Sequence, residues 1–301
     1  MSNTDTPDNG DDRRRAEDRA IYDVPEDDQL VRGLAAIRQR AADLENWRSK
    51  RPDLWPVVLK KMKIRWTTDS NAIEGSSLTF ADTLFFLEQG LTVQGKPLKD
   101  FLDARNHADA VELVFDAVAN RRPISESFLK ELNALLLSGV RTTPARDQFG
   151  NIFEKPANPG QYKQQPNHVI LPDGNLHTYA DPLHVSTEMQ ALVDYVANSQ
   201  HDPVLIAALA HYNFVRIHPF DDGNGRGARI LMNLIIMRGM LPPAVIRNED
   251  RAEYLATLRQ ADAGDARPFA MFIARSVHDT LKSMIDDFEQ ATPVNSQGYR
   301  M

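Results

Sequence analysis

The feature that most constrains this chain is a pair of almost wholly apolar helical segments joined by a loop rich in glycine and charge. The first segment spans 203–215 and begins at Asp202-Pro203, a good helix start with an N-cap residue followed by proline in the first turn. The second spans 224–238 and ends at Gly239. Because a helix that is apolar on nearly every side is buried, the sequence predicts two core helices with a polar loop held between them.

The rest of the chain shows mostly helical periodicity, with apolar residues three and four apart among charged ones. Further helices are expected at 30–47, 54–68, 79–89, 100–120, 125–137, 183–197, 252–261 and 268–288. Residues 142–181 break this pattern because they are rich in proline and glycine. Within them, His168–Leu171 and Leu176–Tyr179 flank a turn-forming Pro-Asp-Gly-Asn segment, which is typical of a β-hairpin. The predicted fold class is all-α, a helical bundle with one small β-hairpin.

The two ends of the chain differ in composition from the part between them. Residues 1–25 and 291–301 are largely polar and charged, so we expect two disordered tails. Between the tails we expect an N-terminal helical region, 26–122, and a second helical domain, 123–290, that contains the buried pair. No internal repeat is evident.

Composition excludes several classes of function. The chain has no cysteine, which excludes disulfides, thiolate catalysis and cysteine-based zinc sites. Its formal net charge of -7 argues against non-specific nucleic-acid binding, which needs a basic surface. No apolar run reaches the roughly 18–20 residues of a membrane span, and the first twenty residues contain no apolar signal segment. The expectation is a soluble, cytoplasmic protein without a membrane partner.

The loop between the core helices carries a phosphate-binding pattern. Gly223, Asn224 and Gly225 open the second helix, where free backbone N–H groups and the helix dipole favour an anion. Arg226 and Arg229 are three apart and share a helix face near the same end. Arginines at this spacing are often a solvated face, but these lie on an otherwise buried helix, where an unpaired charge is costly. The set therefore indicates a nucleotide-phosphate site.

Two further residues of the loop suggest catalysis. Asp222 lies beside the predicted phosphate pocket and suits Mg²⁺, which favours one carboxylate plus phosphate oxygens. His218 ends the preceding helix and is suited to take a proton from a hydroxyl near neutral pH. Taken singly, an aspartate before glycine is usually a turn residue and a histidine before proline a helix end.

The segment from His218 to Arg229 resembles the Fic family signature, HPFx[DE]GN[GK]RxxR, without a departure. The resemblance implies the Fic fold, with 123–290 as the Fic catalytic domain. It implies that His218 is the catalytic base, that Phe220 anchors the loop in the core and that Asp222 binds Mg²⁺. It also implies that the ATP phosphates are bound by Gly223, Asn224, Gly225, Arg226 and Arg229.

A second resemblance lies upstream. Residues 70–75, Ser-Asn-Ala-Ile-Glu-Gly, are similar to the family's inhibitory motif, [ST]xxxE[GN], so Ser70, Glu74 and Gly75 are its expected inhibitory residues. The resemblance implies that Glu74 pairs with Arg229 and displaces the γ-phosphate of ATP. The alternative is an ordinary surface glutamate followed by a helix-ending glycine.

Weaker similarities accompany these two motifs. The hairpin predicted at 168–179 is similar in place to the family's flap, which pins the target segment, a mode in which a strand is added to a hairpin edge. The family often has arginine after Gly-x-Tyr before the flap, whereas here Gly160-Gln161-Tyr162 is followed by Lys163. Downstream residues also fit the family: Arg251, Tyr254, Leu258, Gly264 and Asp265.

The expected function is a protein adenylyltransferase that moves AMP from ATP to a Ser, Thr or Tyr hydroxyl of a target protein, autoinhibited through Glu74. Removal of AMP and Doc-like phosphorylation are alternatives, although Doc-like relatives tend to carry lysine where Gly225 stands. Remoter alternatives are a metal-dependent hydrolase using His211, His218 and Asp222, and a non-catalytic interaction module. Family members often self-associate, which leaves a homodimer open.

Overall fold

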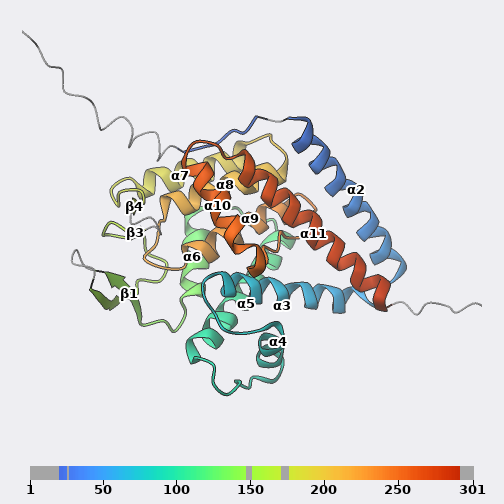
Figure 1. Ribbon diagram of the computed structural model, residues 1–301, viewed down its shortest axis with the longest axis horizontal. Coiled ribbons are helices and arrows are strands. Elements are labelled where there is room, and N and C mark those ends of the chain that lie inside the picture. Colours follow the sequence, from blue (N-terminus) through green and yellow to red (C-terminus); the bar gives the residue numbers. More distant parts are fainter. Residues whose placement is uncertain (1–19, 26, 147–150, 171–175, 292–301) are drawn as a thin grey trace, which may run out of the picture.

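The computed structural model describes residues 20–25, 27–146, 151–170 and 176–291. The helices are α2 (Asp28–Lys50), α3 (Trp55–Ile73), α4 (Phe80–Gln89), α5 (Leu98–Ala119), α6 (Glu126–Leu136), α7 (Val185–Asn198), α8 (Pro203–Ile217), α9 (Asn224–Arg238), the short η1 (Asn248–Asp250), α10 (Arg251–Asp262) and α11 (Arg267–Ala291). The strands are β1 (Thr142–Arg146), β2 (Ile152–Pro156), β3 (His168–Ile170) and β4 (Leu176–Thr178). The all-α prediction is confirmed, because helices dominate the described chain (Figure 1).

Local signals in the sequence set the helix ends. Thr79 and Asp82 form a capping box at the start of α4, and Gly90, at φ 69°, ends that helix. Ser125 caps α6 by accepting the N–H of Phe128 at 3.3 Å. One predicted end is too early: α3 continues to Ile73, so Ser70, Asn71 and Ile73 belong to its buried last turn and Glu74 stands at its C-cap.

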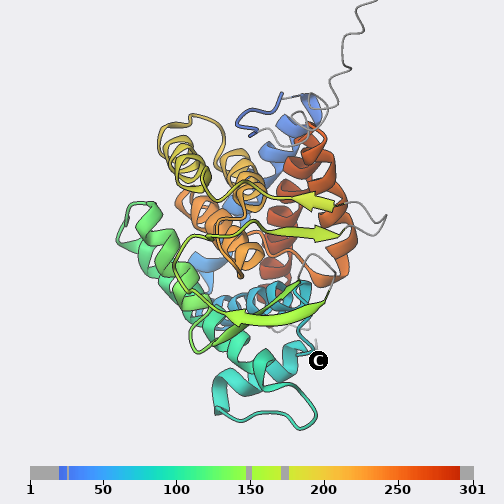
Figure 2. The same ribbon diagram turned by 90° about the vertical axis from the view of Figure 1, so that its left-hand side faces the viewer.

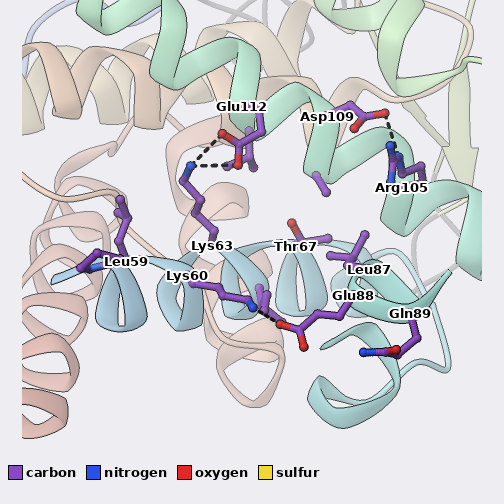
Figure 3. Close-up of a pocket in the computed structure, with 14 residues that line it drawn as sticks. Leu59, Lys60, Lys63, Thr67, Leu87, Glu88, Gln89, Arg105, Asp109 and Glu112 are labelled. Carbon is purple, nitrogen blue, oxygen red and sulfur yellow. Dashed lines mark hydrogen bonds and ion pairs between the residues drawn. The ribbon is translucent and has the colours of Figure 1, made fainter. Parts of the chain in front are cut away.

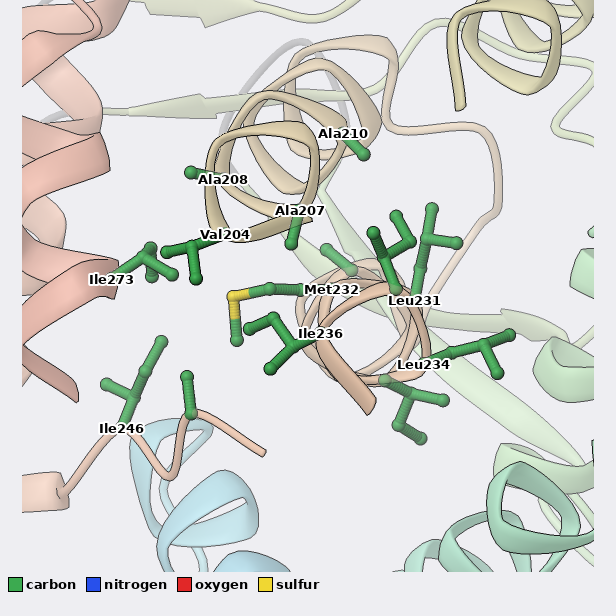
Figure 4. Close-up of a cluster of buried hydrophobic side chains, with 14 of the residues drawn as sticks. Val204, Ala207, Ala208, Ala210, Leu231, Met232, Leu234, Ile236, Ile246 and Ile273 are labelled. Carbon is green, nitrogen blue, oxygen red and sulfur yellow. The ribbon is translucent and has the colours of Figure 1, made fainter. Parts of the chain in front are cut away.

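The core lies where α8 packs on α9 (Figure 4). Small residues on α8 let the two helices approach closely, and Ala207 points toward Met232 of α9. Ile236 of α9 and Ile273 of α11 extend the same apolar cluster. Each large buried apolar side chain stabilises the fold by roughly 1.5–3 kcal/mol, so this pair holds the connecting loop rigidly.

The N-terminal helices wrap around that core. The long helices α2 and α11 pack along each other (Figure 1), and Phe288 of α11 stacks against Trp47 and Trp55. Helices α3 and α5 pack on α9 from another side. This arrangement carries residues far apart in sequence to the first turn of α9.

Two antiparallel hairpins lie on one face of the bundle (Figure 2). Strands β3 and β4 form the predicted hairpin, with His168 opposite Thr178 and Ile170 opposite Leu176. The expectation of a single hairpin is wrong, because β1 and β2 also pair, with Thr143 opposite Lys155. Prolines in both strands concealed this pair, because proline is unfavourable inside a strand.

The predicted N-terminal tail is only partly covered by the described residues. Residues 20–25 are packed against the core: Val24 is buried, and the N–H of Ile21 donates to Oδ1 of Asn213 at 3.2 Å. Residues 1–19 and 292–301 lie outside the described chain. Among the helices that the structure describes, none combines the length and apolar character needed to cross a bilayer.

Candidate active site

The loop between α8 and α9 is closed by its own side chains. Asn224 accepts the N–H of Phe220 at 2.9 Å and donates to the Phe220 carbonyl at 2.8 Å. The Phe220 ring is 1% exposed and packs near Tyr162 and Phe214. The side-chain amide of Asn224 is thus occupied by hydrogen bonds within the loop. Asn224 can therefore bind an anion through its backbone N–H.

Glycine shapes the start of α9. Gly223 has φ 78° and stands at the N-cap position without a side chain to cap the helix. The first hydrogen bond that the helix makes here is from the N–H of Gly227 to the Gly223 carbonyl at 2.8 Å. The N–H groups of Asn224, Gly225 and Arg226 precede that bond, so the helix end suits a phosphate or carboxylate.

The guanidinium of Arg229 is held by the last turn of α3. Nε donates to the hydroxyl of Ser70 at 3.0 Å, and one Nη donates both to the Ser70 carbonyl at 2.8 Å and to Oε1 of Glu74 at 2.7 Å. The side chain of Arg229 is 3% exposed and that of Glu74 is 44% exposed. Burial alone would raise the pKa of the Glu74 carboxyl, but attraction to Arg229 holds that pKa below its ordinary value.

The Glu74 carboxylate lies directly against the first turn of α9. A Cβ on Gly225 would overlap Oε1 of Glu74 and would lie 3.2 Å from Nη1 of Arg229. Gly75, at φ 99°, ends the helix beyond Glu74, and Arg251 donates to the Ile73 carbonyl at 2.8 Å. The structure therefore brings Ser70 and Glu74 to the predicted anion site, and Gly75 follows them at the end of the helix.

Arg226 has a different carboxylate partner. Its Nη1 donates to Oδ1 of Asp103 on α5 at 2.8 Å, and both side chains are buried. The other oxygen of Asp103 accepts from Lys99 at 2.5 Å. No local pattern in the sequence marked Asp103, because its partner lies 123 residues away. Both loop arginines are thus oriented by helices of the N-terminal region.

The imidazole of His218 has a defined orientation. The residue lies in the left-handed region at φ 50°, at the C-cap of α8, and its ring stacks on Tyr179 with centroids 3.7 Å apart. Nδ1 is 3.3 Å from the Val215 carbonyl, which can only accept, so Nδ1 carries the proton and Nε2 the lone pair. Burial, and then the nearby Lys163, lower the pKa of His218 to about 3. At neutral pH the ring is an unprotonated base.

A segment that we call the strap, residues 155–167, runs beside the loop. Its hydrogen bonds reach the loop along its length: Lys155 and Asn158 to Asp221, Lys163 to the carbonyls of Ile217 and Pro219, and Asn167 to the Phe220 carbonyl. The lysine that replaces the family's arginine, Lys163, is 2% exposed and donates through Nζ at 3.1 Å to Ile217. No pattern in the sequence indicated that the β1–β2 hairpin leads into such a segment.

Asp222 is the exposed carboxylate of the loop. Its side chain is 37% exposed, and Oδ1 accepts the N–H of Gly223 at 2.6 Å. Its carbonyl accepts from Asn133 of α6 at 2.9 Å, which fixes the backbone there. No group of three or more potential metal ligands occurs within the described residues. One carboxylate next to a phosphate site fits Mg²⁺, which commonly combines one or two carboxylates with substrate phosphates and water.

His211 serves another purpose than metal binding. It is fully buried, and Nε2 lies 3.0 Å from the hydroxyl of Tyr254. Burial, with Arg229 nearby, lowers its pKa to about 3. Among the described residues, no group of three or more potential metal ligands includes His211, which counts against the hydrolase alternative.

A groove of about 730 Å³ between α3, α4 and α5 is separate from this site (Figure 3). Ion pairs lie along it: Lys60–Glu88, Lys63–Glu112 and Arg105–Asp109. Its lining includes none of the predicted site residues, which lie at or near the start of α9.

The fold and the loop together define a helical protein with an anion site and a neutral histidine at the junction of two buried helices. Residues 123–236 match the Fic/DOC family model. The protein adenylyltransferase Fic of Nematostella vectensis is 32% identical over 232 residues, covering 76% of this chain and 50% of that protein. Protein adenylyltransferase fic-1 of Caenorhabditis elegans is 31% identical over 223 residues, covering 71% and 39% respectively. The chain thus spans half or less of these relatives.

Solved structures agree in fold. A Fic-domain-containing signalling protein from Bacteroides thetaiotaomicron superimposes with a TM-score of 0.74 at 29% identity, covering 87% of this chain and 100% of that one. A Fic family protein from Desulfovibrio desulfuricans has a TM-score of 0.70 at 24% identity, covering 89% and 77%. This chain belongs to the Fic/DOC family.

Proposed function

We propose that the protein transfers AMP from ATP to a hydroxyl side chain of another protein. The observation that carries this proposal is the pairing of a neutral His218, whose Nε2 lone pair is available, with the uncapped start of α9 in one rigid loop. A general base and a phosphate-binding helix start in one short loop can together promote attack by a hydroxyl on a bound nucleotide. The named adenylyltransferases among the relatives support AMP as the transferred group.

The reaction assigns a role to each group of the loop. The target hydroxyl oxygen attacks the α-phosphorus of ATP while its proton passes to Nε2 of His218. The bond from the α-phosphorus to the bridging oxygen breaks, and pyrophosphate leaves with that electron pair. The backbone N–H groups at the start of α9, with Arg226 and Arg229, stabilise the charge that develops on the phosphates.

Asp222 is the residue that would hold Mg²⁺ together with the phosphate oxygens. When bound, the cation would offset phosphate charge as a Lewis acid. The protein's own contribution is to keep the Asp222 carboxylate exposed beside the helix end, through the Asn133 contact to its backbone. The target hydroxyl belongs to Ser, Thr or Tyr, and the β3–β4 hairpin is the proposed site where the target segment lies.

The Glu74 carboxylate is proposed to inhibit this reaction. It accepts from Arg229 at 2.7 Å and lies against Gly225, where a phosphate would need the same donors. ATP would still bind, but with its γ-phosphate displaced and its α-phosphorus misaligned. A misplacement of about 1 Å can cost roughly 10²-fold in rate. In this proposal residues 26–122 form the inhibitory region and residues 123–290 the catalytic domain.

The position of Gly225 favours AMP transfer over Doc-like phosphorylation. A Cβ at this position would overlap Oε1 of Glu74, so any other residue there would require the Glu74 carboxylate to shift. Doc-like relatives tend to carry lysine at this position, and the glycine found here therefore supports AMP transfer.

Removal of AMP is a second candidate because of the exposure of Glu74. Oε1 is engaged by Arg229, while the side chain as a whole remains 44% exposed and faces the site. Such a carboxylate is able to orient a water molecule toward an AMP-modified side chain. Glu74→Gly would then abolish removal while it increases transfer.

The test of the proposed function uses ATP labelled at either end. The protein is incubated in a cell lysate with α-labelled or γ-labelled ATP, and proteins are separated and counted. AMP transfer predicts label on protein from α-labelled ATP alone. Label from γ-labelled ATP alone would instead establish a kinase.

A further inference from the structure

Two adjacent carboxylates of the loop have opposite environments. Asp221 is 7% exposed at its side chain, and its oxygens accept from Nζ of Lys155 at 2.6 Å and from Nδ2 of Asn158 at 3.1 Å. Asp222 is 37% exposed and faces the proposed nucleotide site. Both donors to Asp221 belong to the strap, and Lys155 is also part of strand β2.

The charge of Asp221 would harm the site if it were free. The residue lies three positions before the first residue of α9, in the same loop as the proposed phosphate-binding N–H groups. A free anion there repels a triphosphate, because charges of like sign interact over several ångströms at a protein surface. The ammonium of Lys155 compensates this charge, and Asn158 satisfies the second oxygen.

We infer that Lys155 is a positioning residue of the active site: it holds Asp221 paired and buried, so that Asp222 is the one carboxylate of the 218–229 loop that is offered to the nucleotide site. This inference rests on the proposed function, since it concerns nucleotide binding by the same loop. It gives the β1–β2 hairpin a role, because Lys155 is placed by its pairing opposite Thr143.

The other contacts of the strap make this role separable from loop folding. The N–H of Gly160 donates to Asn133 at 2.9 Å, and the N–H of Lys163 donates to the Pro219 carbonyl at 2.9 Å. Asn167 donates to the Phe220 carbonyl at 2.9 Å. These bonds remain when the Lys155 ammonium is removed, so the substitution frees Asp221 and leaves the loop tethered.

The experiment measures binding of a non-hydrolysable ATP analogue to the full chain by calorimetry, with saturating Mg²⁺, at low and high salt. Lys155→Met is expected to weaken binding about tenfold at low salt and less at high salt, because salt screens the freed charge. Lys155→Arg keeps the charge and should bind within about twofold of wild type. The double variant Lys155→Met with Asp221→Asn removes both charges and should restore affinity.

Lys63→Met is the matched control, because it removes a lysine from another carboxylate pair, Lys63–Glu112, away from the site. It should bind the analogue like wild type. Unchanged binding in Lys155→Met, or a loss that Asp221→Asn fails to restore, would overturn the inference. If wild type itself failed to bind the analogue, the proposed function would fall instead, so the two failures are distinct.

Discussion

Oε1 of Glu74 lies 2.7 Å from the guanidinium of Arg229, although 155 residues separate the two along the chain. The contact forms because α3 packs on α9 and continues one turn further than its apolar pattern suggests. Ser70, one turn earlier on α3, binds the same guanidinium. The last turn of one helix therefore occupies the donors at the first turn of another.

His218→Ala should abolish AMP transfer while nucleotide binding persists. The imidazole makes a hydrogen bond to the Val215 carbonyl and stacks on Tyr179, and in the proposed mechanism it takes the hydroxyl proton without holding phosphate. Loss of a general base typically costs about 10²–10⁴-fold in rate. Transfer is measured by labelling and binding by calorimetry. Near-normal labelling by this variant would remove His218 from the role of base.

Asp222→Ala should lose both activity and the dependence of activity on Mg²⁺. Asp222 is the exposed loop carboxylate beside the start of α9. The check is a titration of labelling rate against Mg²⁺ concentration, with Asp222→Glu as the variant that retains a carboxylate. A titration curve for Asp222→Ala that superimposes on that of wild type would contradict the assignment.

Stability should fall as the solution is acidified below about pH 6.5. His107 and His211 are fully buried, and burial lowers the pKa of His211 to about 3 and that of His107 well below its ordinary 6.5. His218, whose pKa burial also lowers to about 3, is a third such group. Below pH 6.5 the unfolded chain therefore binds three protons that the folded chain excludes, so acid favours unfolding. At about 1.4 kcal/mol for each of the three histidines, the free energy of unfolding should drop by about 4 kcal/mol between pH 7.5 and 5.5.

Urea unfolding at those two pH values measures the drop, and His211→Gln provides the control. Glutamine cannot titrate, so the variant should lose about a third of the pH-dependent difference, whatever its absolute stability. A pH-dependent difference identical to that of wild type would show that His211 does not stay neutral in the folded protein.

Much of the fold followed from local patterns. The capping pair Thr79–Asp82 and the apolar runs around the loop predicted helices that the structure contains. The β3–β4 hairpin was also predicted, from its turn residues. These elements are set by neighbours in sequence, which is why periodicity and turn chemistry were sufficient to find them.

The supporting contacts of the site could not be predicted in the same way. Asp103 meets Arg226 across 123 residues, and Lys155 meets Asp221 across 66. A buried ion pair between distant residues has no periodic signature, because each partner alone looks like a solvated charge. The β1–β2 hairpin was missed because prolines within it indicated a loop. Proline is nevertheless tolerated in edge strands, and both strands of a two-stranded hairpin are edges.

Labelling by Glu74→Gly tests directly whether the protein has an AMP-transferring site that Glu74 restrains. Removing the carboxylate frees Arg229 and clears the space above Gly225. Transfer from α-labelled ATP to the protein itself and its targets should rise at least tenfold over wild type. Glu74→Gly combined with His218→Ala should remain unlabelled, because relief of inhibition cannot replace the base. Equal labelling by wild type and Glu74→Gly across a range of ATP concentrations would contradict the claim.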